Sequence, residues 1–315
     1  MRPSRTLLYR LWQASPPLTA VGLVMLAAFA AAAVGVVADA RLVTGAPAWL
    51  KPAKFAISTA IYSLTLAWMF TCLDGWTRTK RWVGWTTAVV FVAEVAIIAV
   101  QAARGVTSHF NVGTVLDGVL FTVMGTGILL AWIASIALMI AAFRHRFADG
   151  ALGWAIRLGL LITVVGASTG GLMTRPTSAQ LEAARIERMT VAGAHTVGAA
   201  DGGPGLPGTG WSLEHGDLRV PHFLGLHALQ FVPLMALLLG GVEAVRRRRL
   251  VLVGAASYAS LFAILLAQAL RGQSVTAPDT VTLVLLAGWL ALTTLGAAFT
   301  AQGPETLSNR VSVSL

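Results

Sequence analysis

The sequence predicts an all-α membrane protein, a polytopic helix bundle with about eight transmembrane helices, and three observations support this fold class. Hydrophobic residues make up 56% of the 315 residues and charged residues only 11%, whereas soluble domains carry roughly 25% charged residues. The mean hydropathy is +0.75. Apolar runs of about 20 residues recur along the chain, and because lipid offers no hydrogen-bond partners, their backbone must be helical.

The predicted spans form two sets of four. Residues 1–17 precede the first half, 18–143, and the second half, 152–300, contains a long insertion at 175–221 and is followed by a tail at 301–315. The run 18–38 is longer than the core of a cleaved signal peptide, so we expect it to remain as a helix. The predicted spans are 18–38, 53–73, 83–103, 115–143, 152–173, 222–244, 250–270 and 281–300.

Basic residues alternate between the two sides of this predicted bundle. They precede the first span and fill every second connection, and the other loops are poorer in them. The positive-inside rule therefore places both termini in the cytoplasm and the 175–221 segment outside the plasma (inner) membrane. The net charge of +10 comes largely from these clusters, so the expected partner is the lipid bilayer and no nucleic acid is expected. The clusters are Arg2, Arg5 and Arg10; Arg78, Lys80 and Arg81; Arg144 and Arg146; the run 246–249; and Arg310.

The 175–221 insertion has two parts. Thr177 and Gln180 have the spacing of a capping box, which predicts a short interfacial helix over 177–192. The stretch 193–210 is rich in Gly and Pro, which disfavours regular structure. It is either a mobile connector, the more common case, or a packed cap that lets backbone approach a ligand.

Two predicted helix ends share a motif. Residues 101–115 read QAARGVTSHFNVGTV and residues 268–281 read QALRGQSVTAPDTV, so both contain Gln-Ala-x-Arg-Gly and end in Thr-Val. The match predicts an internal repeat, with two four-helix halves in parallel orientation. Gln101 and Arg104 would then lie opposite Gln268 and Arg271 about an axis along the membrane normal.

Polar side chains of the spans gather toward the predicted outer side. Such residues are costly in a bilayer and usually face a bundle interior or a cavity. On the sixth span, His222, His227 and Gln230 fall within an arc of about 140° at roughly 100° per residue. Structural roles would also explain these polar residues. Their side chains would bond a neighbouring helix, or, for the arginines, extend to the lipid headgroups. The candidate substrate or proton path is Glu94, Gln101, Gln230 and Gln268, and the candidate cofactor-binding residues are His227, His222, His109, Arg104 and Arg271.

These histidines and arginines favour a membrane-embedded haem or redox protein as the leading hypothesis. Imidazoles ligate haem and metals, and arginines pair with haem propionates. The single cysteine, Cys72, excludes an intramolecular disulfide and a Cys-rich metal site. The expected cofactor is haem b or a transition metal, with His227, His222, His109 and His215 as candidate metal ligands.

The chain distantly resembles the haem A synthase family. The likeness lies in the four-plus-four plan, a Gly-rich end of the fifth span, Trp211 in the outer loop and His222 opening the sixth span. The resemblance implies haem-ligating histidines near the outer face. The chain lacks that family's Glu-x-x-His-Arg signature, so no catalytic residue is carried over.

Other functions fit the same residues. A proton-coupled transporter of a small anionic solute would use Glu94 as its proton-binding carboxylate, and Arg104 and Arg271 would attract the anion. A membrane assembly or sensor protein would instead bind a partner through the outer loop, and a membrane enzyme of another type also stays open. No Walker loop, HExxH or GxSxG motif occurs, so the sequence names no reaction and no substrate.

Overall fold

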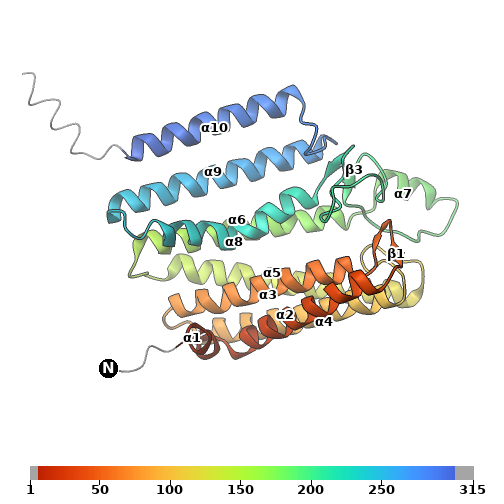
Figure 1. Cartoon of the computed structure of the whole chain (residues 1–315), viewed down its shortest axis with the longest axis horizontal. Helices are drawn as coiled ribbons and strands as arrows, with labels where there is room; N and C mark the ends of the chain where they lie inside the picture. Colours follow the sequence, from red (N-terminus) through yellow and green to blue (C-terminus); the bar gives the residue numbers. More distant parts are fainter. Residues whose placement is uncertain (1–5, 302–315) are drawn as a thin grey trace, which may run out of the picture.

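The computed structural model describes residues 6–301, and its long helices run side by side along one axis (Figure 1). Arg2, Arg5, Arg310 and nearly all of the predicted tail at 301–315 lie outside the described residues. The helices are α1 (Leu7–Ala14), α2 (Pro16–Ala38), α3 (Leu50–Cys72), α4 (Thr77–Ala103), α5 (Val115–Arg144), α6 (Gly150–Met173), α7 (Ser178–Ala183), α8 (Arg219–Leu238), α9 (Ala244–Leu270) and α10 (Thr280–Ala301). The strands are β1 (Leu42–Val43), β2 (Ala46–Pro47), β3 (Thr196–Val197) and β4 (Gly216–Asp217).

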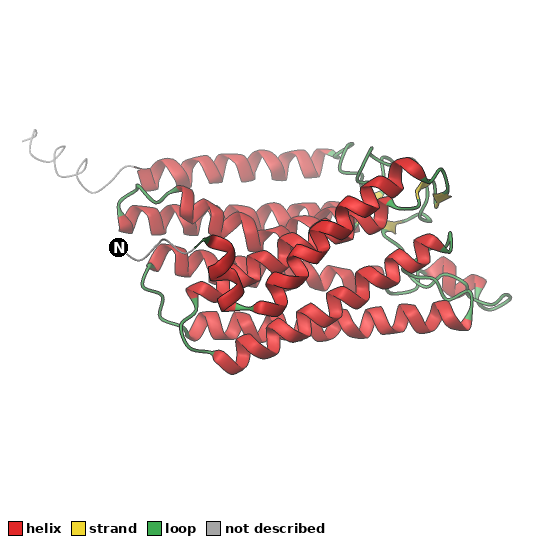
Figure 2. Cartoon of the chain, turned by 60° about the horizontal axis from the view of Figure 1, so that its bottom comes forward, coloured by secondary structure: helices red, strands yellow, loops and turns green. Residues whose placement is uncertain are grey.

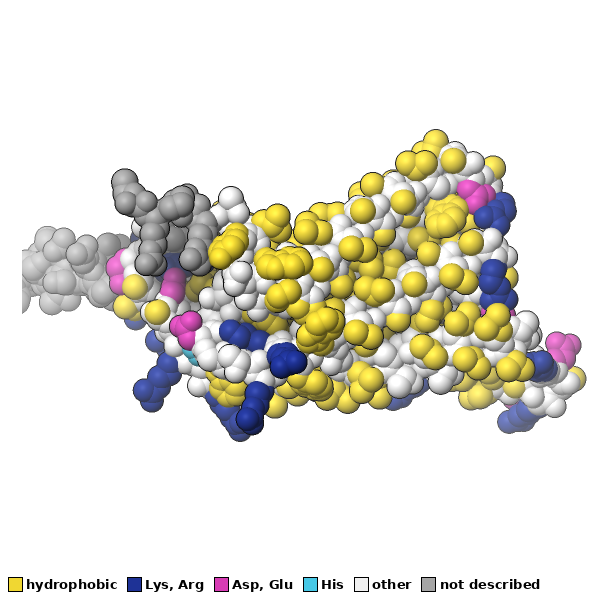
Figure 3. Space-filling view, turned by 90° about the horizontal axis from the view of Figure 1, so that it is seen from below, with side chains coloured by type: hydrophobic (Ala, Val, Ile, Leu, Met, Phe, Trp, Pro, Cys, Tyr) yellow, Lys and Arg dark blue, Asp and Glu magenta, His cyan; other side chains and the backbone are white. Residues whose placement is uncertain are grey.

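Eight of these helices are long and apolar enough to cross a membrane, which confirms the predicted fold class. They are α2, α3, α4, α5, α6, α8, α9 and α10. Hydrophobic side chains cover the middle of the bundle, and Lys and Arg gather toward its two ends (Figure 3). The chain is therefore a multi-pass membrane protein.

Several helix boundaries differ from the predicted spans by part of a turn to two turns. The sixth span was predicted at 222–244, but α8 begins at Arg219 and ends at Leu238. The seventh was predicted from residue 250, but α9 begins at Ala244. The Glu243 carboxylate accepts hydrogen bonds from the N–H groups of Val245 and Arg246, so the helix starts before its arginines. Hydropathy does not register such polar first turns.

The bundle has two ends, which we call the loop end, where residues 174–218 lie, and the basic end, which carries α1 and the loops α3–α4, α5–α6 and α8–α9. Within the first half, α2 packs on α3 and α4, and α4 on α5. Within the second, α6 packs on α8 and α9, and α9 packs on α8 and α10. Contacts of α5 with α6 and of α3 with α8 join the halves. Within the described residues, the strands lie at the loop end (Figure 2).

α6 and α8 approach each other closely enough for their backbones to touch. A Cβ built on Gly166 would lie 2.4 Å from the Cα of Gly225, and one built on Gly159 would lie 2.9 Å from the carbonyl oxygen of Ala228. Only glycine fits at such a crossing, and close packing through small residues is a common way for helices to associate in lipid. This contact fixes the position of α8, and with it the loop end of the second half.

The long insertion packs against the bundle as a cap through hydrogen bonds of its own and with α3. Its predicted helix over 177–192 shortens to α7, while the predicted capping box of Thr177 and Gln180 is confirmed. The Gln180 side chain also bonds the N–H and the carbonyl of Gly193, both at 2.9 Å. β3 pairs with β4, so even the Gly-rich stretch contributes a short strand. The cap covers the ends of the bundle helices at this side.

The two matching sequence motifs form matching turns at the loop end. Gln101 Nε2 donates to the carbonyl of Thr107 at 3.5 Å, and Gln268 Nε2 donates to the carbonyl of Ser274 at 2.7 Å. Each glutamine thus reaches the carbonyl six residues ahead. Gly105 and Gly272, four residues after each glutamine, both take left-handed backbone angles, with φ of 73° and 75°.

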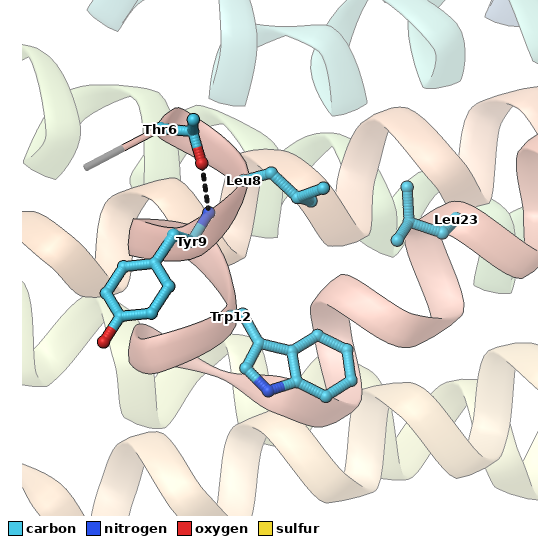
Figure 4. Close-up of a pocket in the computed structure, with 5 residues that line it drawn as sticks. All are labelled: Thr6, Leu8, Tyr9, Trp12 and Leu23. Carbon is cyan, nitrogen blue, oxygen red and sulfur yellow. Dashed lines mark hydrogen bonds between the residues drawn. The ribbon is translucent and has the colours of Figure 1, made fainter. Parts of the chain in front are cut away.

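The short helix α1 lies at the basic end, beside the start of α2. Leu11 is buried, while Leu7, Leu8 and Trp12 stay exposed, so the helix has an apolar outer face. Leu8 and Trp12 line an open groove with Leu23 of α2 (Figure 4). An apolar face at this position is typical of a helix that lies in the membrane interface.

Candidate functional site

The centre of the candidate site is a buried carboxylate beside a histidine. Glu94 projects from α4 and is 4% exposed, and its Oε1 lies 3.3 Å from Nε2 of His109 in the loop after α4. The other oxygen, Oε2, is buried and has no hydrogen-bond partner among the described residues. A buried carboxylate oxygen without a partner is costly, so this atom marks a position where a proton, a water molecule or a ligand would be stabilised.

Aromatic rings and a hydroxyl fix the orientation of His109. Its ring centroid lies 5.4 Å from that of Phe55 and 6.2 Å from that of Phe110, and its Nδ1 lies 3.1 Å from the Ser108 hydroxyl. Burial, assisted by the charge of Lys51, lowers the pKa of His109 well below its usual value. His109 is therefore neutral at pH 7, and its imidazole can pass a proton to or from Glu94.

Lys51, in the first turn of α3, supplies a positive charge near this pair. Its ammonium lies 5.9 Å from the centroid of the Phe55 ring and interacts electrostatically with Glu94. The predicted span began at residue 53, so sequence reasoning left Lys51 outside the membrane and out of the site. A lysine immediately before the proline that opens an apolar run was the available signal.

The cap adds a second pair of a carboxylate and a histidine, Asp201 and His195. Asp201 Oδ2 lies 2.6 Å from Nδ1 of His195, and its carboxylate also accepts the N–H groups of His195 and Thr196. Burial lowers the pKa of His195, against the effect of Asp201. Burial opposes ionisation of Asp201, but the side chain and N–H of His195 lower its pKa below the usual range. The His195 ring packs on Phe110 at 4.8 Å, which links this pair to His109.

Two cations hold the Gly-rich stretch against the bundle. Lys54 Nζ donates to the carbonyls of Gly208 and Thr209 at 3.4 and 3.1 Å, and Arg219 Nη2 donates to that of Gly210 at 2.5 Å. Arg219 is itself paired with the buried Asp217 at 2.6 Å. A polar cavity of about 30 Å³ beside Arg219 is lined mainly by the cap and has room for a water molecule or two, but not for a larger solute.

The predicted arginines form ion pairs within the chain. Arg104 pairs with Asp117 at 2.8 Å and also donates to the side chain of Gln101, which in turn donates to Asp117 at 2.8 Å. Arg271 pairs with Asp279 at 3.2 Å. The two groups occupy equivalent turns in the two halves, and no contact joins them within the described residues. Both guanidinium groups thus already have a carboxylate partner.

The candidates on α8 face different neighbours. Nδ1 of His222 lies 3.0 Å from the Thr169 hydroxyl and 3.1 Å from the carbonyl oxygen of Gly166, both on α6. Gln230 instead donates to Thr65 of α3 at 3.3 Å. The His227 ring packs on Phe223 at 4.2 Å. His222 also interacts electrostatically with His109, in the loop after α4.

The predicted metal ligands do not meet. Within residues 6–301, no group of three His, Cys, Asp or Glu side chains is arranged to hold a metal ion. His215 donates its backbone N–H to the Ser212 hydroxyl at 3.0 Å, within the cap. Of the residues expected to hold a haem, Arg104 and Arg271 are paired with carboxylates, and His109 contacts Glu94 and Ser108. The cofactor stays a prediction.

Comparison with known proteins finds no relative of the chain. No family model matches the chain, and neither a curated protein nor a solved structure is found to be similar to it.

Proposed function

We propose that the chain is a proton-coupled transporter of a small anionic solute, with Glu94 and His109 as its proton-binding pair. The observation that carries the proposal is a carboxylate inside a membrane-spanning helix, 4% exposed, with one oxygen on His109 and the other unpartnered. A buried carboxylate in this state gains from binding a proton, because an isolated charge is costly in a low-dielectric interior. Ionisable residues of this kind commonly serve as proton relays in membrane transporters.

Lys51 couples the solute to the proton. In the absence of solute, its ammonium compensates the charge of Glu94. An anion that binds Lys51 competes with Glu94 for that ammonium, and Glu94 then takes up a proton through neutral His109. Anion and proton are therefore bound together, and for a monovalent anion the pair moves without net charge.

We further propose that the site opens to the outside and that the basic end faces the cytoplasm. Among the described residues, Arg and Lys outnumber the acidic side chains at the basic end, where the acids are Asp74, Asp149 and Glu243. The loop end carries acids and bases in similar numbers, which fits the positive-inside rule. The matching turns after α4 and α9 support an internal repeat of two four-helix halves, a plan that transporters use for alternating access.

The leading hypothesis from the sequence, a haem or metal redox protein, has less support. It required arginines free to pair with propionates and histidines free to ligate iron, and the contacts of Arg104, Arg271 and His109 satisfy these groups within the chain. The absorption spectrum of the purified protein, before and after reduction with dithionite, tests it directly. A Soret band in the purified protein, together with an α-band after reduction, would favour the redox function over the transporter.

Anion-driven proton entry tests the transporter. Proteoliposomes that contain the purified full-length protein and the pH-sensitive dye pyranine are given an inward gradient of phosphate, sulfate or lactate. At least one of these anions is expected to acidify the lumen, and Glu94→Gln is expected to reduce this entry to the level of empty liposomes, because the amide cannot bind the transported proton.

Glu187→Gln is the matched control, since it makes the same chemical change at an exposed position of the cap. It is expected to transport like the wild type. Equal proton entry in the Glu94→Gln variant and the wild type would overturn the proposal, as would a wild-type protein that moves protons with none of the three anions.

A further inference from the structure

At the basic end, two guanidinium groups stack on one tryptophan. The guanidinium of Arg157 lies 5.3 Å from the centroid of Trp154, and that of Arg248 lies 5.9 Å from the same ring. Arg157 also lies 5.1 Å from the Phe147 ring, which packs on His145 at 4.6 Å. Cation–π contacts of this kind hold both arginines in place.

Acidic side chains do not neutralise this pair. The carboxylate of Asp149 is bound to Arg247 at 2.8 Å, and Glu243 accepts the N–H groups that begin α9. Arg157 donates to the carbonyls of Ala142 and His145 at 3.1 and 2.7 Å, and it forms no ion pair among the described residues. Two cations that contact the same ring and have no carboxylate partner among the described residues would stabilise an anion from outside the chain.

An apolar stripe leads from Trp154 toward the membrane centre. Leu158, Leu161 and Val165 follow at intervals of four, three and four residues, so they share one face of α6 with Trp154. Leu161 is 38% exposed and Val165 is 48% exposed, so this face is open to lipid. Tryptophan with arginine at the end of such a stripe is the usual composition of a membrane interface.

We propose that Arg157, Arg248 and Trp154 form a binding site for the headgroup of an anionic phospholipid, whose acyl chains lie along the α6 stripe. The phosphodiester provides the missing negative charge, and guanidinium groups bind phosphate oxygens through paired N–H donors. A zwitterionic phospholipid adds a positive ammonium that two arginines disfavour. A soluble phosphate would gain nothing from the apolar stripe, so the occupant is a lipid.

Native mass spectrometry of the delipidated full-length protein tests the site. Phosphatidylglycerol or phosphatidylcholine is added to the detergent solution, and the bound fractions are compared. The wild type is expected to prefer phosphatidylglycerol, and Arg248→Gln is expected to weaken its binding by roughly tenfold, the effect of losing one charge-assisted hydrogen bond. Because Arg248 is exposed, this substitution leaves the fold intact.

Arg246→Gln is the matched control, since it removes the same charge from an exposed position of the same helix that does not contact Trp154. It is expected to bind phosphatidylglycerol within about twofold of the wild type. Equal loss in the two variants would overturn the proposal in favour of diffuse charge attraction, and so would equal binding of the two lipids. Equally tight binding of glycerol phosphate would overturn the lipid as the occupant.

Discussion

His109 shows how a single side chain at the loop end gains its charge state from its surroundings. Burial and the ammonium of Lys51 keep it neutral, although it lies 3.3 Å from a carboxylate oxygen of Glu94. Asp201 shows the opposite case, because its hydrogen bonds with His195 outweigh burial and keep it ionised. Neighbouring residues therefore keep His109, in the loop after α4, uncharged and Asp201, in the cap, ionised.

The neutral state of His109 predicts a loss of stability in mild acid. In the unfolded chain a histidine takes up a proton as the pH falls below about 6.5, whereas folded His109, with its lowered pKa, does not. Stability therefore falls as the pH drops through 6.5, by about 1.4 kcal/mol at pH 5.5 for one such group. Thermal unfolding in detergent should show that the His109→Gln variant loses less stability than the wild type between pH 7.5 and 5.5. Equal losses would mean that another group carries the dependence.

Which residues meet at the site was only partly predictable. Glu94 was a candidate because a carboxylate in an apolar run has no stem long enough to reach water, and His109 was one of the candidate cofactor histidines near the predicted outer side. Lys51 was missed because the start of a helix within a polar turn is invisible to hydropathy. The His195–Asp201 pair was missed because it depends on a turn through Gly198, whose φ of 88° cannot be read from sequence.

At the scale of elements, α6 packs on α8 so closely that their backbones touch. This packing places Gly166 against Gly225, and it lets the hydroxyl of Thr163 on α6 donate to the carbonyl of Leu226 on α8 at 3.3 Å. Such contacts replace the hydrophobic driving force that is missing between helices in lipid. The α8 boundary and the direction of His222 toward α6 both follow from this contact.

A methyl group at Gly166 is expected to destabilise the fold. Its Cβ would lie 2.4 Å from the Cα of Gly225, and backbone cannot move aside as a side chain can. Gly166→Ala should therefore cost about 1–3 kcal/mol, measured as a lower unfolding temperature in detergent. Gly171→Ala, on the same helix with open space around its Cβ, is the control and should be neutral or slightly stabilising. Equal effects of the two substitutions would contradict the close contact.

At the scale of the whole molecule, the eight spans and their order were predictable, since only helices of this length satisfy their backbone in lipid. The packed state of the insertion was not, because it rests on individual hydrogen bonds such as those from Lys54 to the carbonyls of Gly208 and Thr209. Those contacts join residues about 150 positions apart, and composition carries no signal for them.

The proposed orientation predicts which end reacts with a membrane-impermeant maleimide. In a Cys72→Ser background, Ala184→Cys places a thiol on the exposed cap and Ala148→Cys places one on an exposed loop at the basic end. Right-side-out vesicles should label the Ala184→Cys variant, and inside-out vesicles the Ala148→Cys variant. The reverse pattern would show that the basic end faces outward.

The backbone contact between Gly166 and Gly225 also decides which parts of the bundle can move. Two helices that touch through their main chains resist sliding past each other, so α6 and α8 would move together as one rigid unit. The halves, in contrast, are joined by side-chain hydrogen bonds, from Trp132 to the carbonyl of Val164 at 2.9 Å and from Gln230 to Thr65 at 3.3 Å. Relative motion of the halves would therefore repack side chains between them, including the apolar cluster of Leu66, Ile156 and Leu229, and would leave the contact of α6 with α8 intact.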